Sequence, residues 1–136
     1  MGRRASREIA MKLLYQLEFQ KEDRDEQLNA VLEDNSLTES DREYIKDVVY
    51  GVLNNISDID KTIETNAKGW KINRISKVDL AILRLGIYEI GFREDIPYSV
   101  SVNEAVELAK KYSGEDAGSF VNGILGKVPK SKELLL

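Results

Sequence analysis

The side chains best suited to chemistry in this sequence lie close to its amino terminus. They are three arginines and one tyrosine, which share a sector of a predicted helix because successive helical residues turn by roughly 100°. These residues are Arg3, Arg4, Arg7 and Tyr15. Guanidinium groups bind phosphate oxygens, and a tyrosine ring can stack on an unpaired RNA base. The pattern therefore predicts an exposed RNA-binding face, with a solvated helix start and a ring at the core edge as structural alternatives.

This basic cluster stands against an acidic background. The chain of 136 residues holds 20 Lys and Arg against 24 Asp and Glu, whereas residues 1–12 hold four bases and one acid. Cations at a helix start oppose the helix dipole, so their position costs stability and indicates another use. Because salt screens charges beyond about 8 Å, a local cluster attracts phosphates even on an anionic protein.

Catalytic and metal-binding chemistry is poorly supported by the residue types present. The chain has no cysteine and no histidine, which removes thiolate nucleophiles, the commonest general base and the usual zinc ligands. The stretch 118–123 resembles the start of a phosphate-binding loop, but Ile124 and Leu125 stand where lysine and a hydroxyl residue are needed. These absences exclude most hydrolase and transition-metal sites, so we assign no catalytic residue, no cofactor and no metal.

Helical periodicity places the basic cluster on the first predicted helix, and the same periodicity continues through the first half of the chain. We predict a first helix over about 4–20 and a short second helix that ends near residue 35. A capping box at 40–43, in which Ser40 and Glu43 would bond each other's backbone amides, opens a third helix. A fourth helix is predicted over about 57–67.

The second half of the chain is organised around an apolar segment at 75–90. Apolar residues there occupy nearly every side, which is typical of a helix surrounded by partners. Trp70 precedes this segment, and we expect it to pack at the junction. A capping box at 101–104, in which Glu104 reaches the Ser101 amide, opens the next helix, and a last apolar stripe covers 120–128.

Three charged residues interrupt this apolar segment. They are Asp79, Arg84 and Glu89. The simplest expectation is that they mark the rim of the helix or pair with one another. The alternative expectation is that they belong to a surface that binds a partner.

Taken together, these patterns predict an all-α fold of about seven helices. Alternation at 98–102 would suit a strand, but no second segment offers a partner, and a lone strand is unstable. We expect a single domain over 1–136, with helical subdomains over about 1–67 and 70–136 and a loose tail from Lys130. Neither a membrane-spanning run nor a secretory leader is evident, so the expected location is the cytoplasm.

Several groups of residues carry a family resemblance. They are Arg3-Arg4-x-x-Arg7-Glu8 with Leu14-Tyr15, Asp79-x-x-Ile82-Leu83-Arg84 with Tyr88-Glu89, Ile96-Pro97, Asn103-Glu104-Ala105-Val106-Glu107-Leu108-Ala109-Lys110, and Phe120-Val121-Asn122-Gly123-Ile124-Leu125. Together they resemble the NusB transcription antitermination family over essentially the whole chain. The acidic region 21–37 matches no motif of that family.

The resemblance implies a non-enzymatic, all-helical protein of two small bundles, three helices and then four. It also implies a protein partner, the small-subunit ribosomal protein NusE. The pair would bind the boxA element of ribosomal RNA leader transcripts within the RNA polymerase antitermination complex.

The resemblance also implies site residues. The residues expected to contact RNA are Arg3, Arg4, Arg7, Tyr15, Phe120 and Asn122. Asp79 and Asp116 are expected to face NusE, which suits the basic character of ribosomal proteins. Phe120 also begins an inward stripe, so core packing is the competing interpretation of that residue.

Two other functions remain open at this point. A similar helical fold forms the leading domain of some ribosomal RNA cytosine methyltransferases, which also need a nucleotide-binding domain and a catalytic cysteine. The other alternative is a structural helical oligomer, such as a homodimer, with residues 3–15 at the subunit interface.

Overall fold

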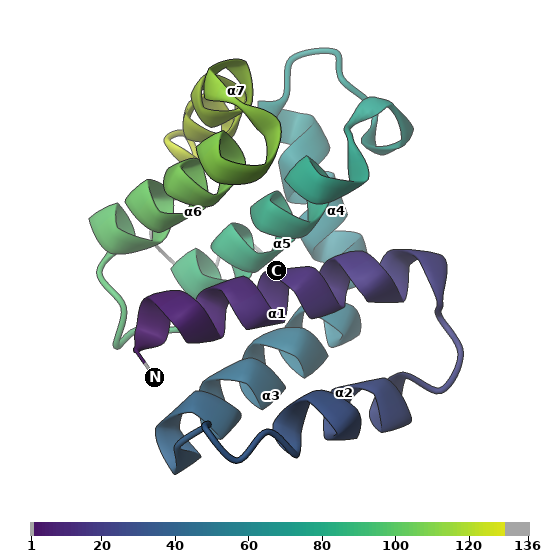
Figure 1. The fold of residues 1–136 in the computed structure, drawn as a ribbon. Helices are drawn as coiled ribbons and strands as arrows, with labels where there is room; N and C mark the ends of the chain where they lie inside the picture. Colours follow the sequence, from purple (N-terminus) through teal and green to yellow (C-terminus); the bar gives the residue numbers. More distant parts are fainter. Residues whose placement is uncertain (1, 130–136) are drawn as a thin grey trace.

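A computed structural model describes residues 2–129, and within them the chain forms seven α-helices, one 3-10 helix and no strand (Figure 1). The elements are α1 (Arg3–Phe19), α2 (Arg24–Leu32), α3 (Glu39–Asn54), α4 (Ile56–Asn66), η1 (Ile72–Arg74), α5 (Lys77–Phe92), α6 (Tyr98–Ser113) and α7 (Glu115–Leu125). The predicted all-α fold of about seven helices is therefore confirmed. The tail predicted from Lys130 lies outside the described residues.

Helix α5 forms the centre of the molecule, as its apolar sequence predicts. Every residue from Leu80 to Gly91 is buried. Helices α1 and α3 pack against one part of α5, and α6 and α7 pack against another (Figure 1). A side chain at Gly86 would place its Cβ 2.8 Å from the Cδ1 atom of Leu125, so this glycine allows α5 and α7 to approach closely. None of the described helices is long and apolar enough to cross a membrane.

The start of α3 differs from the prediction by a small shift in the cap. The Asp41 backbone amide donates to the Thr38 hydroxyl at 3.1 Å, and the Thr38 amide donates to the Asp41 carboxylate at 2.8 Å. Thr38 and Asp41 therefore form the capping box, and the predicted pair of Ser40 and Glu43 lies inside the helix. Both pairs have suitable residue types, and the earlier one adds two residues to the start of the helix.

The starts of α4 and α6 also come earlier than predicted. Helix α4 begins at Ile56, after Asn55. Helix α6 begins at Tyr98, directly after Pro97, whose φ of −60° already suits a helix start. The predicted capping box at 101–104 is therefore wrong, because Ser101 lies one turn inside the helix. The same helix covers 98–102, which confirms that this stretch is not a strand.

The link between α4 and α5 turns sharply before Trp70. Lys68 has a φ of 41° and Gly69 a φ of 88°, and the Trp70 amide donates to the Ala67 carbonyl at 3.3 Å. Two successive residues in the left-handed region reverse the chain, which glycine tolerates without strain. The buried apolar residues form one cluster from α1 to α7, and a subdomain boundary at 67–70 stays a proposal.

Candidate nucleic-acid and partner interface

Arg7 lies in the interior of the protein. The residue is 2% exposed, and its Nε and Nη2 atoms donate to the Glu89 carboxylate at 2.8 and 3.2 Å. Burial alone would lower the pKa of Arg7, but the hydrogen bonds and charge of Glu89 more than offset this and raise it. The expectation that Arg7 stands on an exposed face is wrong, because a buried carboxylate on α5 draws its guanidinium inward.

Glu89 joins four helices through its carboxylate. Besides Arg7 of α1, it accepts hydrogen bonds from the hydroxyls of Tyr44 on α3 and Ser101 on α6, the latter at 2.8 Å. Burial and the negative charge of Glu89 raise the pKa of the Tyr44 phenol, so the phenol remains a neutral donor. This buried polar cluster fixes the start of α1 against α3, α5 and α6.

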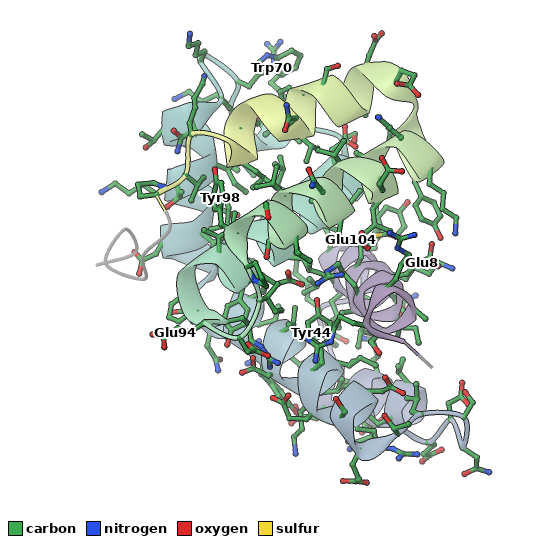
Figure 2. All side chains as sticks on the ribbon, turned by 90° about the vertical axis from the view of Figure 1, so that its left-hand side faces the viewer. Glu8, Tyr44, Trp70, Glu94, Tyr98 and Glu104 are labelled. Atoms are coloured by element: carbon green, nitrogen blue, oxygen red, sulfur yellow. The ribbon has the colours of Figure 1, made fainter. Side chains whose placement is uncertain are left out.

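Arg3 and Arg4 lie at the surface, and each already has a partner within the protein. Arg4 donates to both oxygens of Glu104, at 2.9 and 2.7 Å, while its side chain is 79% exposed. Glu104 therefore pairs with Arg4 and does not cap α6, and the hydrogen bond from Arg4 lowers the pKa of Glu104. The Arg3 guanidinium lies 4.4 Å from the Tyr44 ring centroid. Figure 2 shows Tyr44 and Glu104 beside α1.

Tyr15 remains available to a ligand, and a second ring accompanies it. Tyr15 is 37% exposed and meets Phe19 edge to face, with ring centroids 5.1 Å apart. Phe19 is 60% exposed. Sequence reasoning missed Phe19, although its spacing of four residues from Tyr15 places both rings on one helix face.

The candidate residues of α7 form a separate group. Phe120 is partly buried, and Asn122 is exposed. Phe120 contacts the edge of Trp70, with ring centroids 5.7 Å apart and an interplanar angle of 67°. Trp70 is 49% exposed, so the expectation that it simply packs at the junction is only partly right. Within residues 2–129, no hydrogen bond, ion pair or ring contact joins these α7 residues to the arginines of α1.

The charged residues of α5 do not pair with one another, contrary to the simplest expectation. Arg84 binds Asp60 at 2.8 Å and Glu18 at 2.8 Å, and both carboxylates belong to other helices. Asp79 lies in the first turn of α5, and its Oδ1 atom is shielded from solvent without a hydrogen-bond partner in the described structure. Asp116 is exposed in the first turn of α7. Acidic groups at helix starts also interact favourably with the positive end of the helix dipole, and this would be a purely structural role.

The sequence and the fold both match known proteins. The sequence model of the NusB family matches residues 4–130. The chain is 71% identical to the transcription antitermination protein NusB of Ruminiclostridium cellulolyticum, covering 96% of this chain and 90% of that protein. It is 69% identical to the protein of the same name from Acetivibrio thermocellus, covering 97% and 91%.

Two solved structures extend the match to the fold. One is NusB of T. maritima, with a TM-score of 0.87 and 39% identity over 93% of this chain and 89% of that one. The other is a chain from a crystal structure of NusB and NusE in complex with double-stranded RNA, with a TM-score of 0.81 and 32% identity over 91% and 92%. The chain therefore belongs to the NusB family, whose members are transcription antitermination factors and not enzymes.

Proposed function

We propose that this protein binds the boxA element of ribosomal RNA leader transcripts together with NusE, as part of the antitermination complex of RNA polymerase. The observation that carries the proposal is the close fold match to a NusB chain that was crystallised with NusE and RNA. Its site of action is then the cytoplasm, where bacterial transcripts are made.

On the RNA side, the proposal assigns direct contacts to the surface members of the α1 cluster. Arg3 and Arg4 keep their guanidinium groups at the surface, and Tyr15 has an exposed ring. A phosphate can replace the Glu104 carboxylate on Arg4, because the Arg4 side chain is 79% exposed and Glu104 keeps Arg7 as a second partner at 3.5 Å. Arg7 acts indirectly, by holding α1 in place through Glu89.

On the protein side, the proposal assigns Asp79 and Asp116 to NusE. Ribosomal proteins are generally basic, so an acidic surface would steer and orient the partner. The unpartnered Oδ1 atom of Asp79 supports this assignment, because this partly exposed side chain would gain a hydrogen bond by turning toward a donor of NusE.

Fluorescence anisotropy of a labelled boxA oligoribonucleotide, with and without NusE, tests the function. We expect tighter binding to boxA than to a scrambled RNA. We expect tighter binding again with NusE, because the binding free energies of two linked surfaces add. Equal affinity for both RNAs in the presence of NusE would contradict the proposal.

Arg4→Ala tests the α1 assignment. We expect weaker RNA binding and a salt dependence that is flatter by about 0.7 in log–log slope, as for one lost phosphate contact. Arg24→Ala removes an exposed arginine of α2 and serves as the matched control. If both variants behave alike, Arg4 has no special role.

A further inference from the structure

Within residues 2–129, a group of unpaired positive charges lies in the link between α4 and α5, away from the amino terminus. Residues 68–77 hold four bases and no acid. Lys68, Lys71 and Arg74 are exposed, and no carboxylate of the described chain lies within ion-pair distance of them. In contrast, Arg4 already pairs with Glu104, and Arg7 is buried against Glu89. A phosphate can therefore bind this link without displacing an existing partner.

The same link presents an aromatic ring to solvent. Trp70 is 49% exposed, although burial of its apolar surface would be favourable. Its edge contact with Phe120 of α7 holds the ring in place. Figure 2 shows Trp70 at the top of the molecule next to α7.

The backbone of the link is fixed on both sides of Trp70. The Trp70 amide donates to Ala67, and the Ile72 amide donates to the Glu64 carboxylate at 2.9 Å. The Arg74 amide donates to the Lys71 carbonyl at 2.9 Å and closes η1. The ring and the charges are thus presented by an ordered segment, which lowers the entropic cost of binding.

We propose that residues 68–74 form a second contact site for single-stranded RNA, in which Trp70 stacks on an unpaired base. Lys68, Lys71 and Arg74 contact the flanking phosphates, and the site continues over Phe120 to Asn122. Proteins that bind single strands combine these two features, a positively charged track and aromatic rings that accept bases. The inference rests on the proposed function, because the RNA is the same transcript.

Charge decides between RNA and protein as the occupant. An exposed tryptophan is also a common anchor at protein interfaces. However, residues 68–74 hold three bases and no acid, which repels a basic ribosomal protein and attracts a polyanion.

The chain contains a single tryptophan, so its fluorescence reports on this site alone. In the experiment, boxA RNA is titrated into the full chain in the presence of NusE. A NusE variant without tryptophan is used, or the emission of NusE alone is subtracted. Tryptophan emission and the anisotropy of labelled RNA are followed in parallel. We expect the emission to be quenched with the same midpoint as the anisotropy change.

Variants test the ring and the charges separately. Trp70→Ala should weaken RNA binding by about tenfold, and Trp70→Phe should retain most of the affinity, because any aromatic face can stack. Lys68→Gln with Lys71→Gln should flatten the salt slope by about 0.7 for each lost contact. The control with the same net charge is Lys21→Gln with Lys46→Gln, two exposed lysines of other segments. Circular dichroism and thermal unfolding confirm that each variant is folded.

The outcomes separate this inference from the proposed function. If RNA binds while tryptophan emission and the affinity of Trp70→Ala stay unchanged, the second site is refuted and the function stands. If Trp70→Ala loses affinity for NusE and keeps its affinity for RNA, Trp70 belongs to a protein interface and the inference fails. If the wild-type protein with NusE does not bind boxA RNA, both proposals fail.

Discussion

At the scale of single residues, three neighbouring arginines have three different roles. Arg7 is buried against Glu89, Arg4 forms an exposed pair with Glu104, and Arg3 lies over the Tyr44 ring. Identical side chains therefore contribute differently, because burial determines whether an ion pair can be exchanged for a ligand.

The buried pair leads to a stability prediction. Arg7→Ala should lower the free energy of unfolding by about 3–5 kcal/mol, because it leaves the Glu89 carboxylate buried without a cation. Arg4→Ala should have a much smaller effect on the free energy of unfolding, since its side chain is 79% exposed. Urea denaturation measures both, and similar losses for the two variants would contradict the structure.

Paired carboxylates predict acid sensitivity. The hydrogen bond from Arg4 lowers the pKa of Glu104, and hydrogen bonds from the Thr38 amide and Ser6 lower the pKa of Asp41. A carboxylate whose pKa is lower in the folded than in the unfolded protein contributes stability. This stability is fully present above the unfolded-state pKa and is lost as the pH falls through the folded-state pKa. The unfolding free energy should therefore decrease as pH falls below the ordinary values of 4.5 for Glu and 3.8 for Asp.

Glu104→Gln provides the test of this pH dependence. The variant cannot lose a charge at this position, so its stability should decrease less steeply with acid than that of the wild type. Urea denaturation at a series of pH values gives the two profiles. Superimposable acid limbs would show that the pair with Arg4 contributes nothing to the pH dependence.

At the scale of helices, the cap at the start of α3 distinguishes the observed from the predicted boundary. Thr38→Ala should lower stability by about 1 kcal/mol, because the Asp41 amide loses its acceptor. Ser40→Ala should have little effect, since Ser40 is exposed within the first turn. Thermal unfolding of the two variants compares the boundaries, and a larger loss for Ser40→Ala would favour the cap predicted from sequence.

Two helical glycines test how closely the helices pack. A Cβ at Gly51 of α3 would overlap the ring of Tyr88 on α5, so Gly51→Ala should destabilise the protein by about 1–3 kcal/mol. A Cβ at Gly123 of α7 would meet nothing within 4 Å, so Gly123→Ala should stabilise it by about 0.5–1 kcal/mol. Urea denaturation measures the change in the free energy of unfolding. A change of the same sign in both variants would show that packing does not distinguish these sites.

At the scale of the whole molecule, we propose that acidic and basic surfaces bind different partners. Asp116→Asn removes an exposed charge of α7 that faces a basic protein in the proposed complex. We expect slower association with NusE at low salt and an unchanged dissociation rate, because such charges steer encounter more than they hold the complex. Surface plasmon resonance separates the rates, and unaltered association would remove Asp116 from the interface.

The sequence alone determined the number of helices, their approximate limits, the central position of α5 and the family. These properties follow from apolar periodicity and capping residues, which act over a few residues. The predicted caps of α3 and α6 lay two and four residues too late, because competing caps such as Thr38 and Ser40 have equally suitable side chains. The sequence suggested candidate residues on α1 and α7, but it did not reveal which of them are exposed.

Only the tertiary structure decided which basic residues are free to bind a ligand. Arg7 meets a carboxylate 82 positions away and Arg4 one that is 100 positions away, whereas Lys68 and Lys71 meet none in the described chain. Whether a charge is paired depends on side chains brought together by packing of distant helices, and no local pattern contains that information. For the same reason, only the folded chain shows that Trp70 contacts Phe120 and still leaves about half of its surface in water.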